Sequence, residues 1–141
     1  MMMMTNIAER PRFKVNIHPN ILNVRNIKWG DVVYVNFGEP VGSEQGGVRP
    51  AIVVSNNIGN STSPCIAVAP ITSEYKKPIP THIIIYPTRA TGLKTTSTVM
   101  LEQVRTIDKS RILSKIGHLE AESLISKIES SLKIAFDKNL S

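Results

Sequence analysis

Residues 30–55 read GDVVYVNFGEPVGSEQGGVRPAIVVS, and this stretch decides the fold. Residues 32–37 have the β-branched and aromatic content of a strand. The largely apolar run at residues 51–55 is typical of a strand that is buried on both faces. Residues 38–48 contain four glycines and a proline, which indicates a long loop. The sequence therefore predicts two strands joined by a glycine-rich loop, with Arg49-Pro50 opening the second strand.

Downstream, short apolar stretches alternate with turn-forming residues. Four more strands are predicted, at residues 65–71, 81–86, 97–101 and 103–107. Turn regions separate them at residues 56–64, 72–80 and 87–96. Asp108 is expected to cap a short helix over residues 109–116. From Glu120 onward, apolar residues recur every three or four positions, which indicates an amphipathic helix that packs on the core.

Six or so short strands followed by one helix predict a mainly β fold with a C-terminal helix, a compact SH3-like β-barrel. Residues 28–141 are expected to form this single domain. Residues 1–27 begin with four methionines and carry four basic residues against one acidic residue. We interpret residues 1–27 as a flexible basic leader, with a start codon placed too early as one explanation of it. An edge strand at residues 13–18 is the alternative.

The composition excludes several classes of protein. With 41% hydrophobic and 20% charged residues, the chain is ordinary for a globular protein. It has neither a run of about 20 apolar residues that could cross a bilayer nor the apolar stretch of a secretory signal in residues 1–27, which points to the cytoplasm. The net charge of +6 favours polyanionic partners only weakly.

The single cysteine, Cys65, excludes an intramolecular disulfide and a cysteine-based zinc site. We interpret it as a small core residue of a strand. No group of His, Asp and Glu has the spacing of metal ligands, so we predict neither a metal nor a cofactor. His82 is expected in a strand and His118 at a helix end, where each is more often structural than catalytic. An acid–base pair of histidines is possible chemistry, but the spacing does not support it.

Two residues at predicted strand ends could carry chemistry. Arg49 lies where the glycine-rich loop enters an apolar strand, and a charge there is costly unless it is paired or faces a pocket. It could pair with Asp31 or Glu44, or its planar guanidinium could bind a phosphate. Thr72 follows the third predicted strand and has no distinctive feature by itself.

Several motifs together resemble one protein family. They are GDVVY at residues 30–34, VGSEQGGVRP at 41–50, NIGN at 57–60, SP at 63–64, PIT at 70–72, PTH at 80–82 and LEQVRTID at 101–108. In this order and spacing they resemble MazF/PemK toxins over about residues 28–137, and the chromosomal MazF enzymes of Gram-positive bacteria most of all. The loop motif and LEQVRTID are the most specific of them.

The resemblance implies a barrel of the MazF/CcdB/Kid type, a homodimer, and the toxin of a type II toxin–antitoxin system. It implies sequence-specific cleavage of single-stranded mRNA, blocked by a cognate antitoxin. The family's catalytic arginine and threonine fall on Arg49 and Thr72. The RNA-contacting residues fall on Gln103 and on Glu44 and Gln45 of the loop.

In the implied reaction, the RNA 2′-OH attacks the adjacent phosphate and leaves 2′,3′-cyclic phosphate and 5′-OH ends. The nucleophile belongs to the substrate, so the reaction needs no metal. Arg49 would stabilise charge on the phosphoryl oxygens, and Thr72 would donate a hydrogen bond to them or hold the 2′-OH. A guanidinium is a poor proton acceptor, so no residue is assigned as the general base.

The loops are candidates to cover the RNA. Gly46 lies in the glycine-rich loop, where glycines permit close approach of a ligand to the backbone. Lys76 and Lys77 lie in the loop after Thr72, although a solvated surface explains these two lysines equally well.

Two other classes of function are considered. A toxin of the same barrel shape that binds and poisons DNA gyrase would need no arginine–threonine pair. An SH3-like adaptor that binds peptides would usually line its groove with aromatic residues, and only 5% of this chain is aromatic. We therefore predict an endoribonuclease, with gyrase poisoning as the alternative.

Overall fold

The computed structural model describes residues 26–139, so the leader predicted for residues 1–27 lies almost wholly outside the described residues. Ile27 is 3% exposed and packs in the core, so the folded part includes this residue. The strands are β1 (Asp31–Asn36), β2 (Val48–Val53), β3 (Cys65–Thr72), β4 (His82–Ile85), β5 (Ser97–Met100), β6 (Arg105–Asp108) and β7 (Ile112–His118). The helices are α1 (Asn57–Thr62) and α2 (Glu122–Phe136), with short 3-10 turns η3 (Leu101–Gln103) and η4 (Lys109–Arg111).

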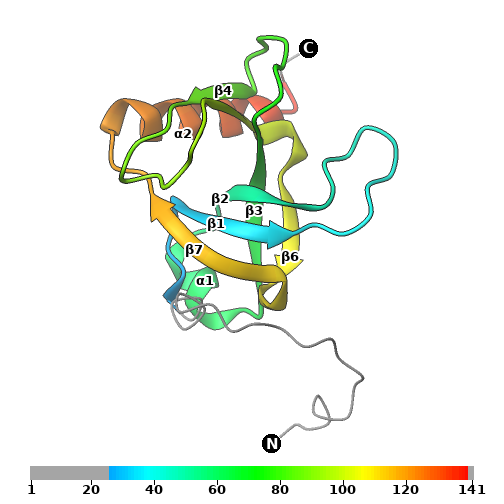
Figure 1. Ribbon diagram of the computed structural model, residues 1–141, viewed down its shortest axis with the longest axis vertical. Coiled ribbons are helices and arrows are strands. Elements are labelled where there is room, and N and C mark those ends of the chain that lie inside the picture. Colours follow the sequence, from blue (N-terminus) through cyan, green and yellow to red (C-terminus); the bar gives the residue numbers. More distant parts are fainter. Residues whose placement is uncertain (1–25, 140–141) are drawn as a thin grey trace, which may run out of the picture.

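The strands form one bent antiparallel sheet in the order β4-β5-β3-β2-β1-β7, and β6 pairs with β3 off this path. The bend passes through β3, whose earlier residues pair with β2 and β6 while Ile71 and Thr72 pair with β5. In Figure 1, α2 (orange) runs across one end of the barrel beside β4, and α1 lies near the opposite end. The predicted mainly β barrel with a C-terminal helix is confirmed.

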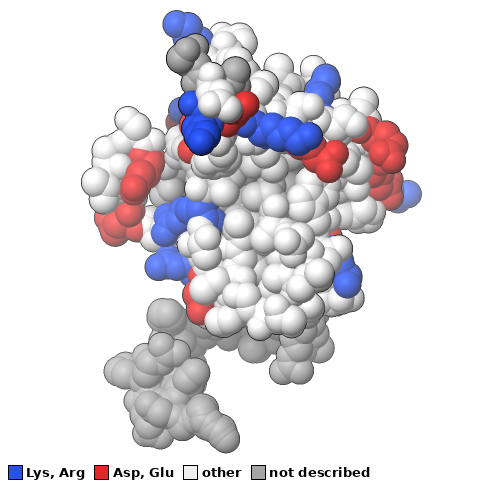
Figure 2. All heavy atoms as spheres, turned by 180° about the vertical axis from the view of Figure 1, so that it is seen from behind, with Lys and Arg blue, Asp and Glu red and all other residues white. Residues whose placement is uncertain are grey.

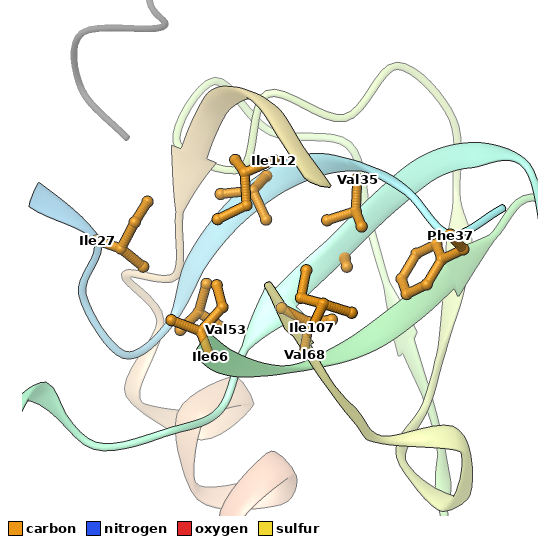
Figure 3. Close-up of a cluster of buried hydrophobic side chains, with 10 residues drawn as sticks. Ile27, Val35, Phe37, Val53, Ile66, Val68, Ile107 and Ile112 are labelled. Carbon is orange, nitrogen blue, oxygen red and sulfur yellow. The ribbon is translucent and has the colours of Figure 1, made fainter. Parts of the chain in front are cut away.

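Successive residues of β1 and β2 face two different cores. Val33, Val35 and Val53 belong to one cluster with Ile27 and Phe37. Figure 3 shows labelled members of this cluster, such as Val35 and Val53, between the strands. The intervening residues Val32 and Ile52 point to a second cluster. Because side chains alternate along a strand, β2 is apolar at every position from Ala51 to Val53, and all three residues are 0% exposed. The prediction of a strand buried on both faces is confirmed.

The second core lies beneath α2. Ile128 of this helix is 0% exposed and packs with Ile71 of β3 and Leu101 of η3. Predicted core packing of the amphipathic helix is confirmed, except at its end, where Phe136 remains 63% exposed.

The predicted helix at residues 109–116 is wrong. Asp108 does cap a turn, because its carboxylate accepts a hydrogen bond from the Ser110 backbone N–H at 2.8 Å. The turn ends at Arg111, and β7 follows and pairs with β1, so His118 ends a strand instead of a helix. The hydrogen bonds along β1 outweigh the weak helical preference of this segment, as non-local pairing often does.

Two smaller predictions also need correction. Residues 56–64 were expected to be a turn, but they contain α1, whose N-cap Asn56 accepts a hydrogen bond from the Gly59 N–H at 2.8 Å. Cys65 was interpreted as a core residue, but it is only half-buried. It opens β3, where the first residues alternate between the core and the surface.

Candidate active site

Arg49 and Thr72 are brought together by strand pairing. The antiparallel register of β2 and β3 sets Ala51 opposite Pro70. Continued by two residues, this register sets Arg49 across from Thr72, at the point where β3 turns away to pair with β5. Both residues line one cavity of about 390 Å³. The two candidate catalytic residues therefore share a pocket that opens where two strands diverge.

The Arg49 guanidinium is oriented by the backbone. Its Nε donates a hydrogen bond to the Gly46 carbonyl oxygen at 2.9 Å. Neither predicted ion pair forms, because the Asp31 carboxylate lies 3.1 Å from Lys115 Nζ and the Glu44 carboxylate accepts from the Val41 N–H. Within the described part of the chain, no carboxylate pairs with Arg49, so its terminal nitrogens are available to an anion.

Thr72 is 3% exposed, and its hydroxyl oxygen accepts a hydrogen bond from the Glu74 backbone N–H at 3.2 Å. A hydroxyl is both donor and acceptor, so the Thr72 proton remains available to a ligand in the pocket. Further polar residues that the sequence alone did not single out also line this pocket: Tyr34, Ser73, Glu74, Lys94, Thr95 and Ser97. Lys94 and Thr95 belong to the turn before β5, and Ser97 is the first residue of β5. No local sequence pattern predicts that these three residues lie beside β2.

A second cavity, of about 640 Å³, brings together three of the predicted RNA-contacting residues. Glu44, Gln45 and Gln103 line it, and the Gln45 backbone N–H donates to Gln103 Oε1 at 3.0 Å. This hydrogen bond joins the glycine-rich loop to η3 across 58 residues of sequence. Glu102 and Arg105 also line this cavity, although the sequence did not point to them.

Gly46 lies in the chain between Gln45, which lines the larger cavity, and Arg49, which lines the pocket of Thr72. Its carbonyl oxygen holds Arg49, while its neighbour Gln45 faces the larger cavity. An added Cβ at Gly46 would overlap the ring of Pro40 and the carbonyl oxygen of Gly38. This close approach is the physical reason for glycine here.

Lys76 and Lys77 lie in the loop between β3 and β4, and the structure separates them. Lys76 lines a third cavity, of about 220 Å³, and its Nζ lies 4.0 Å from the Glu74 carboxylate. Lys77 is exposed, and its carbonyl oxygen accepts a hydrogen bond from His82 Nδ1 at 2.9 Å. His82 therefore ties this loop to β4, which supports its predicted structural role.

Charge is distributed unevenly over the surface. Figure 2 shows acidic atoms on the projecting loop between β1 and β2, with basic atoms on the body beside it. Much of this face is uncharged, in keeping with the modest net charge of +6.

Within residues 26–139, no group of three or more His, Cys, Asp and Glu side chains could hold a metal ion. In the same range, no helix is long and apolar enough to cross a membrane.

Known proteins are similar to this chain in sequence and in fold. Residues 28–136 match the family described as PemK-like, MazF-like toxins of type II toxin–antitoxin systems. The chain is 46% identical over 110 residues to endoribonuclease EndoA of Bacillus subtilis (strain 168), an alignment that covers 77% of this chain and 93% of that protein.

Among solved structures, MazF from Deinococcus radiodurans matches with a TM-score of 0.64 and 27% identity, over 77% of this chain and 94% of that one. An endoribonuclease from a mycobacterial species, solved with its cognate antitoxin, has the same fold, with a TM-score of 0.66 and 21% identity over 82% and 99% of the two chains. The chain therefore belongs to the PemK-like, MazF-like toxins of type II toxin–antitoxin systems.

Proposed function

We propose that this chain is an endoribonuclease that cleaves single-stranded mRNA at specific sequences, with Arg49 and Thr72 as its catalytic residues. The observation that carries the proposal is the pocket shared by a buried threonine hydroxyl and an arginine that pairs with no carboxylate of residues 26–139. The relatives named as endoribonucleases support the same activity.

The reaction proceeds by attack of the RNA 2′-oxygen on the adjacent phosphorus. A bond forms between the 2′-oxygen and phosphorus, and the bond from phosphorus to the 5′-oxygen breaks. The 2′-OH loses its proton and the departing 5′-oxygen gains one, so the products are a 2′,3′-cyclic phosphate and a 5′-OH. A carboxylate can accept the first proton, and Glu74 is the carboxylate that lines this pocket.

Negative charge grows on the phosphoryl oxygens in the transition state. Oriented donors at that position can dominate catalysis because they need no rearrangement as the charge develops. The Arg49 guanidinium suits this role, since its Nε is already held by Gly46 and its terminal nitrogens form a planar fork. The Thr72 hydroxyl donates a second hydrogen bond to the same phosphate or holds the 2′-OH.

The larger cavity is suited to read bases. Its carboxylates, from residues such as Glu44 and Glu102, repel phosphate but accept hydrogen bonds from base amino groups. Gln103 Oε1 is taken by the Gln45 N–H, and one N–H of the Gln103 amide points to Met100 Sδ at 3.9 Å, so the second N–H is the donor left for a ligand. Unpaired bases expose the edges that such side chains read, which is why the substrate is single-stranded.

The proposed partners follow from the same site. A MazF from Deinococcus radiodurans is solved together with MazE, and a mycobacterial endoribonuclease with its cognate antitoxin. We propose that a cognate antitoxin covers the RNA site of this chain, that the chain acts in the cytoplasm, and that it forms a homodimer. Light scattering should then give twice the 15.6 kDa mass of the chain.

The decisive test incubates the purified protein with a long RNA in EDTA. We expect cleavage with cyclic phosphate ends, because the substrate supplies the nucleophile. Arg49→Ala and Thr72→Ala should each abolish cleavage, while Arg89→Ala, an exposed arginine outside this pocket, should leave it unchanged. Cleavage by Arg49→Ala at the wild-type rate would contradict the assignment of Arg49 as a catalytic residue.

The gyrase alternative receives no support from the relatives described above. It would return only if the purified protein inhibited supercoiling by DNA gyrase and left RNA intact.

A further inference from the structure

The cavity of about 220 Å³ adjoins the candidate active site. It shares three lining residues, Ser73, Glu74 and Ser97, with the pocket of Arg49 and Thr72. A group that occupies the smaller cavity therefore lies next to whatever is bound at Arg49 and Thr72. The volume is below the roughly 300–1,000 Å³ of pockets for drug-sized ligands, so it suits a single ring system.

A row of paired residues on three neighbouring strands shows where Thr98 of this cavity lies. Thr98 of β5 is the register partner of Thr72 on one side and of Ile84 on the other. Directly opposed residues of an antiparallel sheet point to the same face. Thr98 therefore lies between the catalytic pocket and the apolar side chain of Ile84, and it lines the smaller cavity.

The Thr98 hydroxyl is a buried polar group without a partner in the described part of the protein. Thr98 is 9% exposed, and its hydroxyl makes no hydrogen bond to any residue between 26 and 139. Its neighbour Ser97 is satisfied, because the Ser97 hydroxyl donates to the Thr95 carbonyl oxygen at 2.9 Å. Buried polar groups are nearly always hydrogen-bonded, so the Thr98 hydroxyl is a position at which a ligand atom is expected.

The cavity lining also includes an aromatic ring that belongs to neither hydrophobic core. Tyr75 is 84% exposed and lines the cavity from the loop after β3. Lys76, the next residue, also lines the cavity and brings a positive charge there, with its Nζ 4.0 Å from the exposed Glu74 carboxylate. An exposed aromatic ring beside a basic side chain is the combination that binds single-stranded nucleic acid, through stacking and attraction to phosphate.

The cavity is held in shape by His82. Its Nδ1 lies 2.9 Å from the Lys77 carbonyl oxygen, and its Nε2 lies 2.8 Å from the Glu102 carboxylate. Both ring nitrogens are thus engaged by the protein. His82 forms part of the wall and fixes the loop of Tyr75. The lining also has the exposed hydroxyls of Ser73 and Thr96, and Thr98 carries the buried hydroxyl that is left for a ligand.

We propose that this cavity binds one nucleobase of the RNA, next to the scissile phosphate, with the base stacked on Tyr75 and its edge hydrogen-bonded to the Thr98 hydroxyl. Lys76 contacts a neighbouring phosphate. The proposal rests on the proposed endoribonuclease function and adds to it a base-binding subsite.

The occupant is a base because the cavity adjoins a site for phosphate and combines an aromatic side chain with one buried hydroxyl, that of Thr98, which has no partner among the described residues. An apolar peptide side chain would leave the Thr98 hydroxyl unpaired.

The test begins by mapping the cleavage site of the wild-type protein. A fluorescent oligonucleotide of that sequence, with 2′-deoxyribose at the scissile nucleotide, binds without being cut, and its anisotropy reports affinity. We expect Tyr75→Ala to weaken binding about 5-fold to 150-fold, the range for the loss of one stacked base. Tyr75→Phe is the matched control and should bind as the wild type does, because stacking needs no hydroxyl.

A second set of oligonucleotides lacks the base at one position on either side of the scissile phosphate. At one of these positions, Tyr75→Ala should have no further effect, because the stacking partner is already missing. Thr98→Val keeps the size of the side chain and removes its unpaired hydroxyl, so the fold should be retained. It should weaken binding of the complete oligonucleotide about 2-fold to 10-fold. With the oligonucleotide that lacks the base stacked on Tyr75, Thr98→Val should bind as tightly as the wild type.

The outcomes separate the two proposals. If the wild type cleaves RNA but Tyr75→Ala binds as tightly as the wild type, or its effect is the same at every abasic position, the subsite is wrong and the endoribonuclease stands. An equal loss in Tyr75→Phe and Tyr75→Ala would also overturn stacking. If the wild type does not cleave RNA, the proposed function falls and the subsite falls with it.

Discussion

At the scale of single residues, the candidate active site depends on how Arg49 is held. Its Nε is engaged by the Gly46 carbonyl oxygen, which leaves the terminal nitrogens for the phosphate. Arg49→Lys keeps the positive charge but loses both the planar fork and the Nε hydrogen bond. We expect kcat for RNA cleavage to fall about 100-fold to 1,000-fold, the range for removal of one transition-state donor.

Single-turnover cleavage measures this loss, and circular dichroism checks that the fold is unchanged. A lysine variant that cleaves within a few-fold of the wild type would show that charge alone suffices at this position.

At the scale of elements, β7 shapes the site without contributing a residue to it. The His118 N–H donates to the Ala90 carbonyl oxygen at 2.9 Å, which holds β7 against the turn before β5. An added Cβ at Gly117 would overlap the backbone of Ala90 and Thr91. Gly117→Ala should therefore displace the turn that carries Leu93 and Lys94 to the pocket.

We expect Gly117→Ala to lower the free energy of unfolding by about 1–3 kcal/mol and to reduce cleavage as well. Gly59→Ala in α1 is the control, because its Cβ would meet nothing nearer than 3.5 Å. Urea denaturation measures both variants. A Gly117→Ala protein as stable as the wild type would show that the turn is free to move.

The helix α2 covers the second core through one face. Ile128 is 0% exposed at the centre of that face, whereas Phe136 at its end is 63% exposed. Ile128→Ala should lower the free energy of unfolding by about 2–5 kcal/mol. Phe136→Ala should change it by less than about 0.5 kcal/mol, as for exposed positions in general. Thermal and urea denaturation compare the two, and equal losses would contradict this packing.

At the scale of the whole molecule, the modest and scattered positive charge sets how RNA is bound. The net charge is +6, and Figure 2 shows basic atoms dispersed over the body. We expect few phosphate contacts, so affinity for single-stranded RNA should fall only moderately with salt, by about 0.7 log units per contact for each tenfold increase. Lys76→Gln should reduce the slope by about that amount.

Anisotropy titrations at several salt concentrations measure the slope. Lys127→Gln, at an exposed position of α2 distant from the pocket in sequence and absent from its lining, is the control. If both lysine variants left the slope unchanged, Lys76 would not contact phosphate.

The elements that could be predicted from the sequence are those whose pattern lies in neighbouring residues. The apolar runs of β1, β2 and β3 and the periodicity of α2 are properties of neighbouring residues, and each element formed close to its predicted position. The strand β7 was not predictable in this way, because residues 112–118 become a strand by pairing with β1, some 80 residues earlier in the chain.

The sequence by itself determined that an arginine stands at the start of a buried strand and that a threonine follows another strand. It also contained the motifs of a toxin family. Only the tertiary structure decided that Arg49 and Thr72 share a pocket. It alone placed Thr98 and Tyr75 around a cavity beside it. The physical reason is that each cavity is closed by segments from distant parts of the chain, and their approach depends on strand register and loop anchoring instead of on local preference.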